Sequence, residues 1–260
     1  MSVPWAAANN AAWCDLVCRT AGLPTGRRRG FWSTTTRSPD AYPDAVTLRP
    51  GVRADDVVAA IDATPGASVK DSFADLDLAP SGFSVLFEAH WVLRAVTPVA
   101  PVPHPSLAWR PVDAGSLPRW LAAHGSVAIR PGVLDDPDVR LLLADDADGP
   151  VAVAALNRST TGDATVVGIS NVQALRADPD VVWQDLVALA HRELGPHPLV
   201  GYESGSDLGP PLHAGFSVAG PLRVWLRRDA RSVERGDRPR EQADPRDGEH
   251  ERQPLGDPRR

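Results

Sequence analysis

Two short stretches of the chain carry side chains that could do acid–base chemistry. Tyr202 and Glu203 stand side by side at the end of the apolar run Leu199–Glu203, which predicts a strand. A carboxylate at such a place can accept a proton, directly or through a water, and a phenol can donate one. The alternative is a strand-end pair that only bonds to the neighbouring loop. We expect Glu203 as general base and Tyr202 as proton donor.

Lys70 and Asp71 occupy the corresponding place in the first part of the chain, near the end of an expected strand at residues 68–73. Lys70 is the chain's only lysine. The pair predicts an ordinary surface ion pair, worth ~0–1 kcal/mol, with an ion pair that lines a pocket as the functional alternative. Cys14 and Cys18 share one helix face and have no accompanying ligands, so we expect buried free thiols and no metal site.

Composition narrows the class of protein. The formal net charge is -6 over 260 residues, which argues against nucleic acid as a partner because phosphate binding needs a basic face. No stretch approaches the ~20 apolar residues of a membrane span. The first residues carry no positively charged leader, and nothing indicates a disulfide framework. We therefore expect a soluble, cytoplasmic protein that does not contact a membrane; its oligomeric state is open.

The pattern of apolar residues predicts an α/β (α+β) chain of two mixed-sheet halves. Residues 1–96 form a shortened first half, in which the basic cluster at 27–29 is expected in a loop and residues 55–63 in a helix. The proline-rich segment 97–106 is extended and serves as a linker. Residues 107–228 carry a strand, a helix, three successive strands, a good helix at 180–194, a strand, a short helix and a last strand. Residues 229–260 are almost devoid of apolar side chains and are expected to be a disordered charged tail.

The two halves contain matching blocks in the same order. Residues 82–94 read GFSVLFEAHWVLR and residues 215–227 read GFSVAGPLRVWLR, and RADDVV at 53 matches RADPDVV at 176. A third block, Asp77-Leu78 and Asp207-Leu208, lies upstream of each GFSV run. Three matching blocks favour an internal duplication over chance.

The order of elements in residues 107–228, together with the ending LVGYESGSDLGPPLHAGFSVAGPLRVW, resembles the GCN5-related N-acetyltransferase (GNAT) superfamily. The resemblance covers residues 1–96 more weakly, as a shortened tandem copy. It implies a sheet whose middle strands part to admit the pantetheine arm of acetyl-CoA. It further implies that the cofactor is held near Gly168, Ile169, Ser170, Asn171 and Val172, with Arg176 close to the phosphates.

One departure from the GNAT pattern concerns the phosphate loop, which in that superfamily reads Arg/Gln-x-x-Gly-x-Gly/Ala. Residues 170–180 here contain no glycine, and Asp178 and Asp180 stand where the pyrophosphate would lie. A helix cap at Asp178 with Pro179 in the first turn explains these residues without a ligand. Many members of the superfamily carry a tyrosine four residues before the Gly-Phe pair, and Pro211 occupies that position here. His213 is an alternative proton donor or a plain surface residue.

Two functions follow from these observations. The first is an acyl-CoA-dependent N-acyltransferase, an N-acetyltransferase that acts on a small amine. The alternative is a catalytically degenerate GNAT-fold protein that binds a ligand or a partner.

Overall fold

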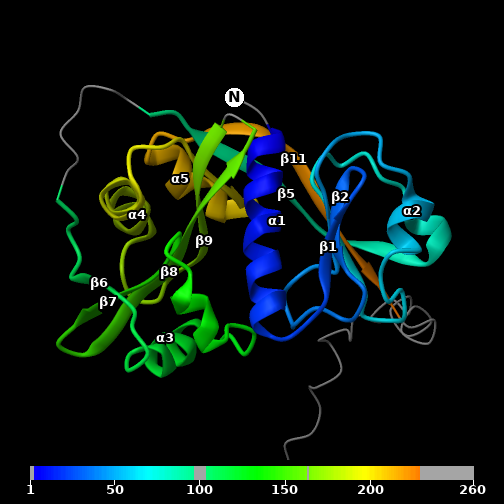
Figure 1. Cartoon of the computed structure of the whole chain (residues 1–260). Coiled ribbons are helices and arrows are strands. Elements are labelled where there is room, and N and C mark those ends of the chain that lie inside the picture. The colour runs from blue at the N-terminus through cyan, green and yellow to red at the C-terminus, as the bar shows by residue number, and fades with distance from the viewer. Residues whose placement is uncertain (1–2, 97–103, 163, 229–260) are drawn as a thin grey trace, which may run out of the picture. The chain divides into compact units, whose positions relative to one another are not determined.

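The computed structural model describes residues 3–96, 104–162 and 164–228. It confirms the α/β class: helices pack on both faces of one mixed sheet of eleven strands (Figure 1). The expected tail at 229–260 and most of the expected linker at 97–106 lie outside the described residues. In chain order, the helices, short 3-10 turns (η) and strands are α1 (Val3–Thr20), β1 (Thr25–Arg28), β2 (Phe31–Thr34), β3 (Ala45–Thr47), α2 (Ala54–Val58), β4 (Ser68–Asp71), η1 (Ala79–Ser81), β5 (Phe83–Arg94), β6 (Trp109–Pro111), α3 (Leu117–His124), η2 (Pro131–Asp135), β7 (Val139–Asp146), β8 (Gly149–Thr161), β9 (Ala164–Ala174), α4 (Pro179–Leu194), β10 (Leu199–Glu203), η3 (Gly205–Leu208), α5 (Gly209–His213) and β11 (Ser217–Arg227).

The order of strands in the sheet is β1-β2-β3-β4-β11-β5-β10-β9-β8-β7-β6. Each GFSV strand therefore lies beside a strand of the other half: β11 pairs with β4, and β5 pairs with β10. The two GFSV strands pair with each other, antiparallel, at the centre. On either side of this central pair stands one parallel pair, β3 with β4 and β9 with β10. The two halves are thus joined through the sheet itself.

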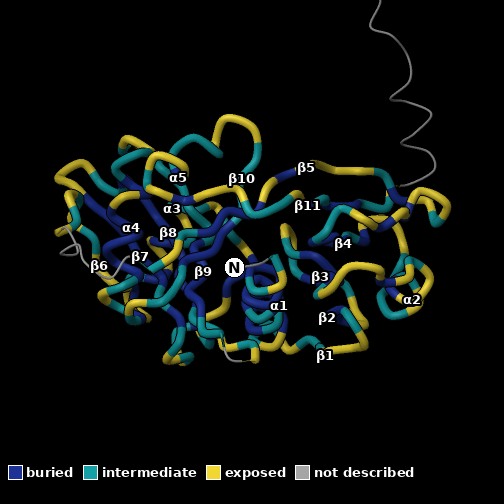
Figure 2. Tube along the Cα trace, turned by 90° about the horizontal axis from the view of Figure 1, so that it is seen from above, coloured by how far each residue is buried: buried dark blue, intermediate teal, exposed yellow. Residues whose placement is uncertain are grey.

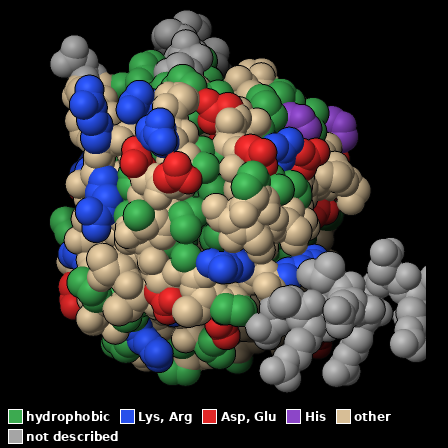
Figure 3. All heavy atoms as spheres, turned by 90° about the vertical axis from the view of Figure 1, so that its right-hand side faces the viewer, with side chains coloured by type: hydrophobic (Ala, Val, Ile, Leu, Met, Phe, Trp, Pro, Cys, Tyr) green, Lys and Arg blue, Asp and Glu red, His purple; other side chains and the backbone are tan. Residues whose placement is uncertain are grey.

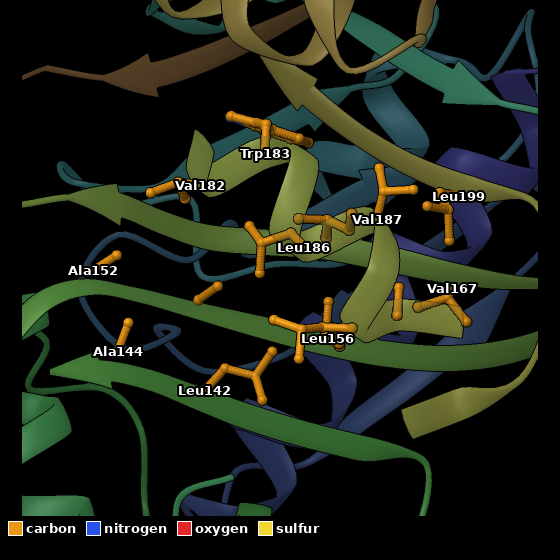
Figure 4. Close-up of a cluster of buried hydrophobic side chains, with 14 of the residues drawn as sticks. Leu142, Ala144, Ala152, Leu156, Val167, Val182, Trp183, Leu186, Val187 and Leu199 are labelled. Carbon is orange, nitrogen blue, oxygen red and sulfur yellow. The ribbon is translucent and has the colours of Figure 1, made fainter. Parts of the chain in front are cut away.

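Helix α4 covers one face of the second half. Asp178 caps it by accepting a hydrogen bond from the Asp180 amide, and Pro179 opens the first turn, as expected. Its apolar stripe packs on strands β7 to β10, where the side chains interdigitate in a closed core (Figure 4). The labelled members of this core are Leu142, Ala144, Ala152, Leu156, Val167, Val182, Trp183, Leu186, Val187 and Leu199.

Helix α1 covers the opposite face and contacts strands of both halves. Most of its residues are buried (Figure 2), and the two cysteines are free and buried, as expected. Asn9 on α1 donates to the Asn157 carbonyl at 2.9 Å and to Ser159 Oγ at 2.9 Å. Gly168 on β9 lies directly beneath, where a Cβ would come within 1.9 Å of the Asn9 Oδ1 atom. A glycine is required there because helix and strand approach so closely.

Three local expectations need correction. Residues 27–29, expected in a loop, partly belong to the edge strand β1, whose exposed arginines help to keep other strands from adding to the edge. Basic side chains also gather along one margin of the face shown in Figure 3. The helix expected at 55–63 is only the short α2. Finally, Lys70 and Asp71 are not a surface ion pair, since they are 4% and 0% exposed. Among the described helices, none is long and apolar enough to cross a membrane.

Candidate functional site

The parallel strands β9 and β10 pair over only two positions and then part. Val167 faces Leu199 and Gly168 faces Val200, after which no further ladder partners join them. Strand β9 nevertheless continues to Ala174, and β10 continues to Glu203. The parting lies next to α4 on one face and α1 on the other. The middle strands of the sheet therefore part, as the resemblance implies.

A bulge in β9 stands at this parting. Its ladder with β8 pairs Ser170 with Ala155 and Gln173 with Val153, so that two residues of β9 face one of β8. Asn171, inside the bulge, has a φ of 53°, in the left-handed region that asparagine tolerates better than most residues. The extra residue of a bulge is left out of the regular ladder, and the bulged strand bends there.

The first of two cavities flanking the parting lies on the α4 side and measures about 670 Å³. We call it the α4-side cavity. Its walls come from the last residues of β9, the first turns of α4, the end of β10 and the η3–α5 segment. The lining residues are Val172, Gln173, Ala174, Leu175, Pro179, Val182, Trp183, Glu203, Ser206, Asp207 and Pro210.

Two titratable residues, Glu203 and Asp207, line the α4-side cavity. Burial, reinforced by the nearby negative charge of Asp207, raises the pKa of Glu203 to about 8. At pH 7 only about a tenth of such carboxyls would be ionised. Glu203 therefore holds a proton at neutral pH, so it can donate one there, and it becomes a base only in alkaline solution.

The second cavity, of about 400 Å³, lies on the α1 side of the sheet. We call it the α1-side cavity. Helix α1, the loop before β3, the end of α3 and strands β4, β9 and β10 all contribute to it. The lining residues are Asn10, Trp13, Cys14, Asp40, Ala41, Tyr42, Pro43, Lys70, His124, Gly125, Ser126, Val127, Ser170, Asn171 and Tyr202.

Backbone strain is concentrated at the α1-side cavity. Three non-glycine residues among those described have a positive φ, and two of them, Ala41 and Asn171, line this cavity. The Tyr42 hydroxyl donates to Asn171 Oδ1 at 3.4 Å, which ties the loop of the first half to the bulge of the second. Left-handed backbone costs an alanine about 1–2 kcal/mol, and residues in such conformations cluster at functional sites.

The predicted pair Tyr202 and Glu203 is divided by the strand that carries it. Consecutive strand residues point to opposite faces, so Tyr202 lines the α1-side cavity and Glu203 the α4-side cavity. The Tyr202 ring packs edge-on against Trp91, with 5.6 Å between ring centroids. The two side chains therefore serve different sides of the parting.

The residues expected to hold a cofactor are also divided. Ser170 and Asn171 line the α1-side cavity, and Val172 lines the α4-side cavity. Gly168 and Ile169 are buried at the start of the parting, Gly168 under α1 and Ile169 in the core beneath α4. These five residues thus follow the edge of the opening along β9.

Arg176 lies apart from this group. It is exposed, and its guanidinium donates to Asp146 Oδ1 at 2.6 Å and to the Gly149 carbonyl at 3.1 Å. The amides of residues 175, 176 and 177 all point to the Val151 carbonyl, at 2.9, 3.1 and 3.3 Å. Strand β8 therefore satisfies the amide donors of the loop before α4. In a phosphate-binding loop these amides would face the ligand.

The amino end of α4 is occupied by carboxylates. Asp178 accepts a hydrogen bond from the first turn, and Asp180 contacts the exposed His213, whose Nδ1 lies 3.0 Å from Oδ1. These groups take the place at the positive end of the helix dipole that an anion would use.

Sequence reasoning missed the α1-side cavity. Its lining comes from six separate stretches of the chain, and among the described residues it holds the ammonium of Lys70, whose burial the sequence did not indicate. The one available signal was that Lys70 is the only lysine in the chain.

These features define a mixed α/β sheet in which two parallel strands part, with a cavity on each face beside the parting. Two solved structures share this fold. A GCN5-related N-acetyltransferase from Kribbella flavida superposes with a TM-score of 0.59 at 15% identity, covering 88% of this chain and 98% of the other. A protein ascribed to the GNAT acetyltransferases from Novosphingobium aromaticivorans gives 0.54 at 11% identity, covering 86% and 99%.

The chain therefore has the GNAT fold, as its sequence predicted. No family model matches the sequence, and no curated protein matches it. At this level of identity the likeness concerns the fold, and activity has to be argued from the site.

Proposed function

We propose that this protein is an acyl-CoA-dependent N-acyltransferase, with acetyl-CoA as donor and a small amine as acceptor. The observation that carries the proposal is the parting of β9 and β10 between two cavities. The donor enters from the α4 side, so that its thioester lies in the parting beside the bulge. The acceptor amine enters from the α1 side. The buried free cysteines suit the cytoplasm, where thiols stay reduced.

In the reaction the amine nitrogen forms a bond to the thioester carbon, and the carbon–sulfur bond breaks. The nitrogen loses a proton to solvent, and the departing thiolate takes one up. Backbone groups of the bulge at residues 170–172 are the candidates for polarising the carbonyl oxygen. Holding the two reactants on either side of one slot supplies the orientation that such a reaction needs.

We assign to Glu203 the role of donating a proton to the departing thiolate sulfur. Its carboxyl lies on the donor side and carries a proton at neutral pH, because its pKa is raised to about 8. Tyr202 belongs to the acceptor side instead. The proposal thus keeps both residues in the site, but it gives the donor role to Glu203.

A second candidate function is a GNAT-fold binding protein without acyltransferase activity. It is favoured by the loop before α4, whose three amides converge on Val151, and by the carboxylates at the amino end of that helix. A carboxylate ~6 Å from a phosphate charge is repelled by about 3 kcal/mol at an effective dielectric near 20. Binding of acetyl-CoA decides between the two functions.

We also infer that the halves are tandem copies. Lys70 faces Val224 and Tyr202 faces Trp91, and both partners stand nine residues after the first glycine of their GFSV block. The order of the sheet, with one parallel pair on each side of the central GFSV strands, supports the same inference.

Calorimetric titration with acetyl-CoA and with CoA tests the proposed function. We expect binding to the full-length protein, and CoA release when an acceptor amine is added. Ala174→Trp, in the wall of the α4-side cavity, should weaken acetyl-CoA binding at least ~10-fold, because an indole occupies the space of the pantetheine arm.

Leu86→Trp is the matched control, because Leu86 is an exposed residue that does not line the α4-side cavity. It should leave acetyl-CoA affinity unchanged. No heat and no thermal shift with millimolar acetyl-CoA would remove the acyltransferase and leave the binding protein. Equal weakening by the two tryptophans would show that the ligand does not use the α4-side cavity.

A further inference from the structure

Lys70 is a buried cation at the wall between two cavities. It is 4% exposed, and it lines both the α1-side cavity and a neighbouring one of about 410 Å³ that contains Leu86 and Phe87. Its Nζ atom lies 3.9 Å from the centroid of the Tyr202 ring and 6.0 Å from that of Trp91. Two aromatic faces thus hold the ammonium beside open space.

No charge of the described part of the chain neutralises this ammonium. Among residues 3–96, 104–162 and 164–228 no carboxylate lies within 4.0 Å of Nζ. The adjacent Asp71 carboxylate is committed to the amides of Leu76 and Phe73. Arg37, the other cation of the neighbouring cavity, is already paired with Asp44.

The remaining ionisable neighbours do not change this balance. Asp40 is exposed on the loop at the rim of the α1-side cavity. Burial raises the pKa of Cys14 to about 11, so its thiol is neutral. Burial also lowers the pKa of His124, which keeps that imidazole neutral. Lys70 is therefore an unpaired positive charge inside the protein.

A buried charge without a partner is costly, and proteins retain one where a ligand or a reaction needs it. Ammonium groups bind carboxylates through short, charge-assisted hydrogen bonds. The α1-side cavity is large enough for a molecule of amino-acid size. It also offers the amide groups of Asn10 and Asn171 as further hydrogen-bonding partners.

We propose that Lys70 binds a carboxylate of the acceptor, and that the acceptor is therefore an amino acid. This inference rests on the proposed function for the acyl-transfer step and names its acceptor. The carboxylate lies against Nζ beside Tyr202, which places the amine, a few bonds away, toward Ser170 and Asn171 at the parting. Acylation of the α-nitrogen then neutralises the amine and leaves the carboxylate bound.

The test is direct binding, measured without acyl-CoA. Glycine, L-leucine and L-phenylalanine are titrated into the full-length protein beside their amides, which retain the amine and lose the carboxylate. At least one acid should bind, and its amide should bind about 10- to 100-fold more weakly. Lys70→Met should weaken that acid by the same factor and leave the amide unchanged.

Arg53→Met is the matched control, because it also removes one positive charge, but from an exposed site away from both cavities. It should change neither affinity. The inference is overturned if none of the acids binds at millimolar concentration, if acid and amide bind equally, or if Lys70→Met retains full affinity for the acid.

A measurement on the unmodified sequence covers the case in which Lys70→Met does not fold. Because the chain has one lysine, labelling with Cε-¹³C lysine gives a single side-chain signal. That signal should shift on addition of the acid and stay in place with the amide. An unmoved signal under saturating acid places the carboxylate elsewhere and overturns the assignment.

The outcomes separate this inference from the proposed function. Binding of an amino acid at Lys70 without any binding of acetyl-CoA would retain the anion site and remove the acyltransferase. Acetylation of neutral amines and amino acids at equal rates, unaffected by Lys70→Met, would retain the acyltransferase and remove the anion site.

Discussion

The two parallel strand pairs of this molecule end in different ways. In the first half, β3 and β4 stay joined beyond their ladder, because the Ser72 amide donates to Thr47 Oγ1 at 2.8 Å. In the second half, β9 and β10 have no ladder partners after Gly168 and Val200, and a cavity flanks each side of the gap. The same strand arrangement is therefore closed in one half and open in the other.

The carboxylates at the ends of β4 and β10 differ accordingly. Asp71 accepts hydrogen bonds from the amides of Leu76 at 2.9 Å and Phe73 at 3.3 Å, and so fixes the turn that follows its strand. Glu203 stands in the α4-side cavity with a pKa raised to about 8. One carboxylate stabilises a closed turn, whereas the other is available for proton transfer.

The helices that connect the two strands of each parallel pair explain part of this difference. Helix α4 has 16 residues and builds a complete core on its face of the sheet, whereas α2 has only 5. A long helix can support two strands that part, because its own packing replaces the lost ladder. A short one cannot, so the first half keeps its strands together. It contributes Lys70 to the site instead of a slot.

The largest expected effect is on turnover. Glu203→Gln removes the proposed donor and should lower the rate of acetyl transfer ~10²-fold or more, which is ~3 kcal/mol of barrier. In the unmodified protein, activity should decline as pH rises through about 8, because the donor then loses its proton. Rates over pH 6–10 with saturating substrates provide the measurement.

Glu88→Gln serves as control, since Glu88 is an exposed carboxylate on β5 that pairs with Arg223 at the surface. It should leave both rate and pH profile intact. A rate that rises through pH 8 and loses this rise in Glu203→Gln would assign Glu203 as the base instead.

Gly168→Ala should destabilise the second half by about 2–4 kcal/mol, because the new methyl group meets the Asn9 side chain and forces α1 from the sheet. Denaturant unfolding measures this loss. Gly26→Ala is the matched control, since a Cβ on Gly26 of β1 meets nothing within 4 Å. If both alanines are equally tolerated, the close contact between α1 and β9 does not exist.

Asp71→Ala should lower the free energy of unfolding by about 1–3 kcal/mol, because it leaves buried amides of the turn without an acceptor. Chemical denaturation at pH 7 is the appropriate assay. Asp75→Ala, in the same turn, removes an exposed carboxylate that accepts only from the Gly51 amide, and it should cost less. Equal losses would mean that Asp71 does not hold the turn.

In the second half, replacing the carboxylate at the end of the strand should have the opposite effect on stability. Glu203→Gln should become more stable relative to the unmodified protein as the pH rises. The folded pKa of Glu203, about 8, lies above the ordinary value of 4.5, so the folded chain binds its proton more tightly than the unfolded chain. Stability from this group is complete below pH 4.5 and falls as pH rises to about 8. The melting temperature of Glu203→Gln relative to the unmodified protein should therefore rise over that window; a constant difference would contradict the raised pKa.

Much of the local structure follows from sequence pattern. The strand 199–203 and the cap of α4 at Asp178 were predicted correctly, because turn residues and apolar periodicity mark them locally. The parting of the sheet came from the resemblance to GNAT proteins. It could not be derived from the residues alone, because tertiary packing determines where the ladder between β9 and β10 ends.

The surroundings of Lys70 could not be predicted either. Its aromatic neighbours Trp91 and Tyr202 are distant in the chain, and they meet Lys70 only because each GFSV strand pairs with the other half. An isolated Lys-Asp pair has the pattern of a surface ion pair. The pair is buried, with its two side chains on opposite faces of the sheet, because each GFSV strand pairs with a strand of the other half.

The smallest expected effect concerns the loop that ties the halves together. Ala41 has a φ of 69°, so Ala41→Gly should raise the free energy of unfolding by ~1 kcal/mol or less, because glycine adopts this conformation without strain but loses more entropy on folding. Ala74→Gly, at a φ of 52° in the turn after β4, is the comparison outside the α1-side cavity. If strain at Ala41 positions Tyr42 against Asn171, Ala41→Gly should also weaken binding of the acceptor amine. Ala74→Gly should raise the free energy of unfolding and leave binding of the amine unchanged. Equal behaviour of the two variants in both assays would mean that the strained loop has no part in the site.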